Sequence, residues 1–364
     1  MTLNPPAAPI TLTPTLPGRY YTDPDIFRTE QEKIFEVEWA FVGRADTVSR
    51  PGDVLRVEVG TESVIVVRGR DGGLRGFLNV CRHRGARLCL TEQTNVGRAI
   101  RCPYHAWTYG LDGQLITAPN WDAMPDLDRS RYGLGPVAVE VWNGLIWVNL
   151  DPAATPLADQ LGPMLEYRLG AQSDRIERWG IGELTVAARR EYDVAANWKI
   201  IQENFQECYH CGTIHPELVE QIPTFASFEE LAGGAYHQGG YRFAAGRPGF
   251  SLSGQARLAE LPRLDEDDRR KYFGMVLRPN CFLSLLPDHV IVHRFLPVSA
   301  DRTLVVCEWL FHRVNLQDFA AAQWCQPNMS SRMYRDGGVL VPTESEIIGN
   351  WYYTWYHDRM GIPR

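Results

Sequence analysis

Two short loops, each carrying one cysteine and one histidine, constrain this chain more than any other feature of its sequence. The first loop contains Cys81 and His83, and the second contains Cys102 and His105. Eighteen residues separate His83 from Cys102. Thiolate and imidazole are both metal ligands. If all four side chains hold one metal centre, the two loops must meet in the fold.

Two kinds of metal centre use two cysteines and two histidines. In a Rieske [2Fe–2S] cluster, two thiolates hold one iron and two imidazoles hold the other. Structural zinc accepts the same set, but zinc ribbons and fingers usually pair Cys with Cys and His with His. Here each loop supplies one of each, as C-x-H and C-x2-H. The spacing therefore predicts a Rieske cluster and single-electron transfer, with a zinc-binding module as the alternative.

The rest of the composition is that of a globular protein. The net charge of −7 gives no argument for nucleic acid or an anionic membrane as a general partner. No apolar run approaches the roughly 18 residues that span a bilayer. Residues 1–17 have neither the charged nor the apolar region of a secretory signal. We therefore expect a cytoplasmic protein with reduced cysteines and no nucleic-acid or membrane partner.

Turn signals place the two loops in a small antiparallel domain. Apolar runs flank three turns that strongly indicate hairpins, Asp71-Gly72, Asp112-Gly113 and Asn143-Gly144. We predict an all-β Rieske domain over residues 41–155. Residues 1–40 contain a helix start at Asp23-Pro24, and we expect this N-terminal segment to pack with the domain that follows the Rieske domain.

Residues 156–364 are predicted to form a catalytic domain, which makes the whole chain α+β. The pattern indicates strands over residues 184–194, 282–286, 290–295 and 304–311, and helices over 197–210, 316–334 and from the capping box at Thr343. Such an order favours a curved antiparallel sheet with helices packed on it, a helix-grip-like arrangement. We interpret residues 151–163 as a linker or surface loop.

His210 and His215 are the candidates for a second metal site. They stand five residues apart with Gly212 between them. Two imidazoles and one carboxylate form the facial triad of non-haem iron(II) oxygenases, which leaves open positions for dioxygen. Asp318, at the start of the predicted helix over residues 316–334, is our choice of carboxylate. Spacing alone favours two structural histidines over an iron site, and an aspartate in the position of Asp318 is more often an ordinary helix N-terminal residue.

Other cysteines and histidines receive structural interpretations. Cys208 and Cys211 flank His210 as C-x2-C, a spacing that could indicate zinc or a redox pair. No second cysteine pair lies nearby, so we interpret them as small packing residues. His293 lies on a predicted strand, where we expect a hydrogen-bonded structural histidine.

Along nearly its whole length, the chain resembles the catalytic subunits of Rieske non-haem iron oxygenases. Five segments carry the resemblance, namely residues 18–23, 79–85, 102–107, 203–210 and 330–332. It is most similar to the branch that oxidises quaternary ammonium compounds such as choline, glycine betaine, carnitine and proline betaine. The resemblance implies a Rieske cluster and a mononuclear Fe(II) held by His210, His215 and Asp318.

The resemblance also implies how electrons move. In this family, the cluster of one subunit reduces the iron of its neighbour in a homotrimer, through a carboxylate that bridges two histidines. Glu207 stands at the bridge position, where much of the family has Asp; the longer side chain suggests a different subunit spacing or a movable bridge. A separate reductase, of flavin plus ferredoxin type, would supply electrons from NAD(P)H. With dioxygen, hydroxylation of an N-methyl group would release formaldehyde and a demethylated amine.

A quaternary ammonium substrate cannot donate hydrogen bonds, so aromatic faces are its natural host. Phe205 and Tyr209, beside the proposed iron ligands, are candidates for such contacts. One rival is an oxygenase acting on an aromatic carboxylate, which would need an arginine in the pocket. Another is a Rieske electron carrier without chemistry of its own, but such a carrier does not need the roughly 200 residues that follow the cluster domain.

Overall fold

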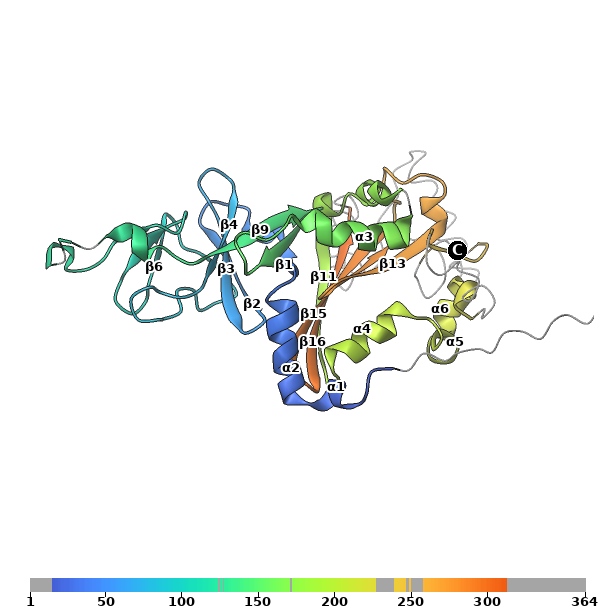
Figure 1. The fold of residues 1–364 in the computed structure, drawn as a ribbon. Helices are drawn as coiled ribbons and strands as arrows, with labels where there is room; N and C mark the ends of the chain where they lie inside the picture. Colours follow the sequence, from blue (N-terminus) through green and yellow to red (C-terminus); the bar gives the residue numbers. More distant parts are fainter. Residues whose placement is uncertain are drawn as a thin grey trace, which may run out of the picture. The chain divides into compact units, whose positions relative to one another are not determined.

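A computed structural model of the chain describes residues 15–123, 125–126, 128–170, 172–226, 239–246, 249 and 258–312. All belong to the first of two compact units, Met1–His312; the second, Arg313–Arg364, lies outside the described residues, as do Asp318 and the predicted helices beyond it. Three antiparallel sheets and several short helices confirm the α+β class (Figure 1). No helix in the described part is long and apolar enough to cross a membrane.

A seven-stranded sheet and a three-stranded sheet contain the strands of the N-terminal half. The larger has the order β1 (Ala40–Arg44), β10 (Leu145–Asn149), β9 (Pro136–Trp142), β4 (Leu74–Leu78), β3 (Glu62–Arg68), β2 (Asp53–Val59) and β5 (Gln93–Asn95). The smaller consists of β6 (Ala99–Arg101), β7 (Thr108–Gly110) and β8 (Leu115–Thr117). All three predicted hairpins are confirmed. Asn143 and Gly144 have φ of 48° and 76°, the conformation that favours Asn-Gly in a two-residue turn.

A six-stranded sheet forms the C-terminal half of the described chain. Its order is β11 (Thr185–Val194), β16 (Arg302–Phe311), β15 (His289–Ser299), β14 (Cys281–Leu285), β13 (Lys271–Leu277) and β12 (Tyr241–Arg242). The predicted long strand and the three-stranded meander are therefore confirmed. Alternate residues pack on different helices: Leu283 and Leu285 belong to the core under α3 (Leu157–Leu169), whereas Phe282 packs with α4 (Trp198–Gln206). The two helices thus cover opposite faces (Figure 1).

The predicted linker over residues 151–163 is wrong in its second half, because α3 begins at Leu157 and continues through Pro163. Four buried leucines repeat at every fourth position of this helix, at Leu157, Leu161, Leu165 and Leu169. Burying each leucine contributes roughly 1.5–3 kcal/mol. Their sum exceeds the cost of about 3 kcal/mol for an interior proline. Packing against the sheet therefore overrides the local signal for a break.

The N-terminal helices α1 (Arg19–Thr22), α2 (Pro24–Glu30) and η1 (Gln31–Phe35) contact α4. The predicted start of α2 is confirmed, since the Asp25 N–H donates to the Asp23 carboxylate at 2.8 Å. At the end of α2, the Glu30 carboxylate accepts from Trp198 Nε1 at 2.9 Å and from Lys199 Nζ at 2.7 Å. These two bonds hold the first turn of α4.

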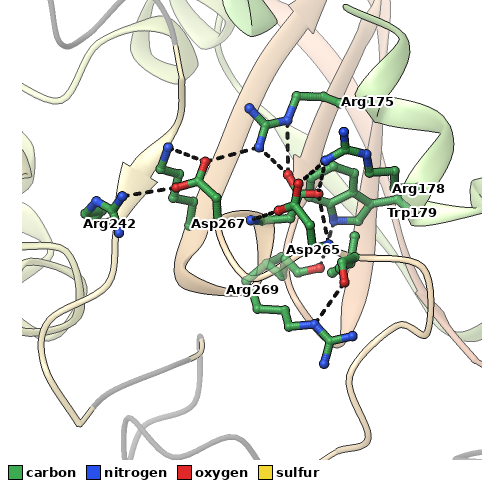
Figure 2. A network of polar contacts seen from close by, with 11 residues as sticks. Arg175, Arg178, Trp179, Arg242, Asp265, Asp267 and Arg269 are labelled. Atoms are coloured by element: carbon green, nitrogen blue, oxygen red, sulfur yellow. Dashed lines mark hydrogen bonds and ion pairs between the residues drawn. The ribbon is translucent and has the colours of Figure 1, made fainter. Parts of the chain in front are cut away.

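The remaining helices are short. They are η2 (Ala45–Val48), η3 (Trp121–Ala123), η4 (Arg129–Tyr132), η5 (Ser173–Trp179), η6 (Ile181–Glu183), α5 (Cys211–Ile214), α6 (Pro216–Gln221), η7 (Pro223–Ala226) and η8 (Asp268–Arg270). A network of ion pairs connects η5 to the turn before β13 (Figure 2). At its centre, the fully buried Asp268 accepts from Arg175 Nε at 3.0 Å and from Arg178 Nη1 at 2.9 Å. Asp268 thereby fixes the start of β13 to η5.

Candidate functional site

The two cysteine–histidine loops lie together beside the three-stranded sheet. Cys81 and Cys102 are buried, whereas His83 is exposed and His105 half-buried. The rings of His83 and His105 lie 4.8 Å apart, and Trp107 stacks on His83 at 5.0 Å. The thiols therefore point inward, while the imidazoles lie at the surface.

Backbone hydrogen bonds shape both loops in the same way. The Gly85 N–H donates to the Cys81 carbonyl at 3.0 Å, and the Ala106 N–H donates to the Cys102 carbonyl at 3.0 Å. Both Gly85 and Ala106 have positive φ, 72° and 58°. Alanine rarely adopts this conformation. The second loop is thus held in a strained turn, which is common where the backbone positions a functional group.

Tyr109, on β7, reaches Cys81 and is a residue that the sequence did not single out. Its hydroxyl lies 3.3 Å from the Cys81 sulfur and accepts the Arg82 N–H at 3.0 Å. Burial raises the pKa of Tyr109, so the phenol keeps its proton and can donate it to the sulfur. Hydrogen bonds to a metal-bound thiolate tune the metal's potential. Only the place of Tyr109 on the strand after the second loop could have suggested it.

The donor atoms of the cluster loops fit a metal centre pair by pair. His105 Nδ1 is buried and has no hydrogen-bond partner among the described residues. An orphaned buried nitrogen is costly unless it binds another group. Within the described ranges, no three His, Cys, Asp or Glu side chains already have the arrangement of a metal site. The side chains instead stand as two neighbouring pairs, since the Cys81 and Cys102 thiols are within hydrogen-bonding reach of each other and the rings of His83 and His105 lie 4.8 Å apart.

The helix that precedes the second candidate site ends earlier than predicted. The sequence predicted a helix over residues 197–210, but α4 ends at Gln206 and Glu207 is extended, with φ −128° and ψ 162°. The Glu207 carboxylate accepts the backbone N–H groups of Tyr209 and His210. A side chain that bonds the following N–H groups offers the backbone an alternative to the helix. Because α4 ends at Gln206, His210 lies outside this helix and stands at the N-terminus of α5.

Glu207 and His210 lie in the turn between α4 and α5, and His215 follows α5 directly, so the two histidines cap the two ends of this one-turn helix. Glu207 Oε1 is 2.5 Å from His210 Nδ1, and the two histidine rings have centroids 5.3 Å apart. Asn204 Nδ2 lies 3.4 Å from both nitrogens of His210. The carboxylate thus orients one imidazole while the second imidazole stands beside it. Two neighbouring imidazoles with an outer carboxylate fit the donor set of a mononuclear metal.

The two predicted substrate contacts differ in their surroundings. Phe205 packs edge-to-face on Phe282 at 5.0 Å and on Phe295 at 5.4 Å, so it belongs to an aromatic cluster between α4 and the sheet. Tyr209 is 83% exposed. The structure therefore brings Phe205 under the sheet face and leaves Tyr209 at the surface of the turn.

His293, interpreted from the sequence as a hydrogen-bonded structural histidine, joins this aromatic cluster and keeps one hydrogen bond, to the backbone of Phe282. Its ring lies 5.2 Å from Phe205 and 5.8 Å from Phe282. Its Nδ1 is buried without a partner in the part of the chain that the structure describes. Burial lowers the pKa of His293 to about 4, against a weaker opposing effect of a backbone bond at Phe282. The imidazole is therefore neutral at physiological pH.

This low pKa predicts acid sensitivity. Below its ordinary pKa of about 6.5, the unfolded chain protonates His293 while the folded chain does not, so stability falls as pH falls toward 4. Between pH 7 and pH 5 the loss is about 2 kcal/mol. In urea unfolding at both pH values, H293F should show a stability loss smaller by that amount. Equal losses in the two proteins would contradict a neutral buried imidazole.

The sequence matches two family profiles in tandem. Residues 38–128 match the Rieske [2Fe-2S] domain, which includes both cysteine–histidine loops. Residues 181–316 match the catalytic domain of the ring hydroxylating alpha subunit, which includes His210 and His215. The match to a catalytic domain is incompatible with an electron carrier that has no chemistry of its own. The match to a Rieske domain is incompatible with a zinc-binding module.

Relatives of established name align with most of the chain. The glycine betaine monooxygenase oxygenase subunit of Chromohalobacter salexigens is 31% identical, over 95% of this chain and 86% of its own. The carnitine monooxygenase oxygenase subunit of Escherichia coli K12 is 30% identical, over 91% of this chain and 88% of its own. A solved structure of the quaternary ammonium Rieske monooxygenase CntA with L-carnitine superposes with a TM-score of 0.63 at 28% identity, covering 88% of this chain and 87% of that one.

Proposed function

Because the chain belongs to the Rieske non-haem iron oxygenases as a catalytic oxygenase subunit, we propose that it removes an N-methyl group from a small quaternary ammonium compound. As a member of this family it carries a Rieske [2Fe–2S] cluster and a mononuclear iron. The full-length similarity to oxygenase subunits for glycine betaine and carnitine supports the substrate class. Glycine betaine is our first candidate.

The cluster is proposed to be held by Cys81, His83, Cys102 and His105. Two buried thiols and two imidazoles at the surface suit a centre that passes electrons outward through its histidine side. Neutral imidazoles in place of two thiolates raise the potential relative to an all-cysteine cluster. The Tyr109 hydroxyl would stabilise the reduced, more negative cluster through its bond to Cys81. Both effects favour acceptance of an electron from a reductase.

The mononuclear iron is proposed to be held by His210, His215 and Asp318, the last of which lies outside the described residues. When bound, an iron with this donor set supplies open positions for dioxygen. Glu207 holds His210 through Nδ1, which orients the imidazole toward the metal. We propose that the same carboxylate also bonds a cluster histidine of a neighbouring subunit in a homotrimer. Its 45% exposed side chain leaves that contact sterically open.

A quaternary ammonium group is best bound by aromatic faces, through cation–π attraction. Phe205 supports this proposal because it lies in an aromatic cluster next to the turn that carries His210. Tyr209 remains a second candidate. A separate reductase, of flavin plus ferredoxin type with NAD(P)H as electron source, would serve the cluster, and the protein is proposed to work in the cytoplasm.

Formaldehyde release tests the proposed reaction. The purified, iron-loaded enzyme with a surrogate reductase should consume dioxygen and release formaldehyde with glycine betaine, L-carnitine or choline. The demethylated amine should appear at its expected mass in a ratio of about one to the formaldehyde released. An aromatic carboxylate in the same panel is the comparison. Dioxygen uptake without a demethylated product from any quaternary ammonium compound would contradict the proposal.

Glu207 provides a test of the electron path. E207Q keeps the size of the side chain but removes the charge, and should slow turnover about 10–100-fold, as is typical when a partner of a metal-bound histidine is changed. The rate of cluster re-oxidation in the presence of substrate and dioxygen measures this step. E207D retains the carboxylate and should keep more activity. Unchanged re-oxidation in E207Q with both metal centres loaded would remove Glu207 from the path.

A further inference from the structure

Cys208 and Cys211 flank His210 and approach each other in the turn after α4. Their sulfur atoms lie 2.6 Å apart. A disulfide bond measures about 2.0 Å, and engineered or natural bridges need cysteines whose side chains already face each other. The Cys211 N–H donates to the Cys208 carbonyl at 3.0 Å, which closes the turn over Tyr209 and His210. The backbone thus presents the two sulfurs to each other.

The surroundings of the two sulfurs differ. Cys211 is 2% exposed and packs among Ile222, Phe225 and Leu286. Cys208 is half-buried at the edge of the same cluster. An oxidant therefore reaches Cys208 first. Cys211 lies beside it and is the resolving thiol, which is the one that attacks the oxidised sulfur and forms the disulfide. This order, a more accessible cysteine with a neighbouring partner, is typical of redox-sensitive sites.

The remaining described cysteines outside the cluster loops lack this arrangement. Cys89, Cys281 and Cys307 are buried, and none of them has a sulfur contact in the described structure. Each of these three thiols is enclosed by protein and has no second sulfur beside it in the described part of the chain, so its oxidation cannot end in a bridge to a neighbour there. They serve as internal controls for the pair beside His210.

We propose that Cys208 and Cys211 form a reversible disulfide that controls whether His210 can hold the mononuclear iron. Hydrogen peroxide oxidises the Cys208 thiol to a sulfenic acid and releases one water. The Cys211 sulfur then attacks the Cys208 sulfur, the S–S bond forms, and the hydroxyl leaves with the Cys211 proton as a second water. Two electrons pass from the two thiols to the peroxide, and an external dithiol reverses the reaction.

The disulfide acts on His210 because both its cysteines belong to the same four-residue turn. Cys211 Sγ lies 4.0 Å from His210 Nε2. Drawing the sulfurs to bonding distance shifts the residues between them, and a metal site tolerates only small displacements of a ligand. Oxidation should therefore release the mononuclear iron and leave the cluster loops untouched. This consequence rests on the proposed role of His210, whereas formation of the disulfide does not.

Mass and metal analysis test the two parts separately. After treatment of the holoenzyme with a small excess of hydrogen peroxide and removal of the oxidant, the peptide that contains both cysteines should be lighter by two hydrogens. Iron should fall from about three to about two per chain, at unchanged cluster absorbance. Dithiothreitol with ferrous iron should restore both. C208S should keep its iron under the same treatment, and C281A should behave as the unmodified protein.

Each other outcome overturns the proposal. Over-oxidation of Cys208 without a bridge rules out the disulfide. A bridge that leaves three irons per chain rules out control of His210, while the formaldehyde assay still decides the proposed reaction independently. Equal loss of iron from C208S and the unmodified protein shows that peroxide acts on the metal directly, without the two cysteines.

Discussion

H210A is expected to lose the mononuclear iron and essentially all oxygenase activity while it keeps the Rieske cluster. His210 lies at the start of α5, His215 lies at its end, and the orientation of His210 is set by Glu207 at 2.5 Å. Changing a partner of a ligand already costs 10–100-fold in metal affinity or activity, so removal of the ligand itself should cost more than about a hundredfold. Total iron should fall from about three to about two per chain, with unchanged visible absorption of the cluster.

A matched control comes from α5, the short helix between the two histidines. Thr213 lies between the two histidines and is exposed. It is not one of the proposed iron ligands. T213A should keep about three irons per chain and the activity of the unmodified protein. H215A should repeat the result of H210A. If H210A and H215A both retain the third iron, the proposed site is wrong and the iron must be sought elsewhere in the chain.

D268A is expected to destabilise the fold by about 3 kcal/mol, the lower end of the cost of breaking a buried ion pair, because the buried Arg175 loses its buried partner and keeps only the half-exposed Asp267. Asp268 is fully buried and accepts from Arg175 and Arg178, and the Arg175 side chain is itself only 8% exposed. Figure 2 shows how both arginines of η5 converge on this part of the network. Urea unfolding followed by tryptophan fluorescence measures the loss, with Trp179 as a neighbouring reporter.

An exposed ion pair of similar geometry provides the comparison. Arg302 and Asp193 form two hydrogen bonds of 2.6 Å each, but both side chains are more than half exposed. Solvent screens such a pair, so D193A should cost less than about 1 kcal/mol. Similar losses for D268A and D193A would mean that burial does not strengthen the network. D268N, which keeps one acceptor oxygen, should fall between the two.

The limits of the sequence are clearest in the two metal regions. The loop spacing predicted two cysteine–histidine pairs that meet, and the rings of His83 and His105 do lie 4.8 Å apart. The pattern around His210 predicted neighbouring histidines, but placed His210 at a helix end. The helix stops at Gln206 because Glu207 binds the next N–H groups. That competition is a property of one side-chain rotamer and leaves no periodic signal.

The sequence by itself determined the features that act over a few residues. Asn143-Gly144 requires a left-handed turn, and Asp23-Pro24 caps and starts a helix, whatever the rest of the chain does. Only the tertiary structure decided which distant groups meet. Helix α3 continues through Pro163 because four of its leucines are buried against the sheet. The pKa of His293 is lowered because phenylalanines from other elements bury its ring. The burial of a side chain depends on residues that are far apart in the sequence, so a local sequence pattern cannot predict it.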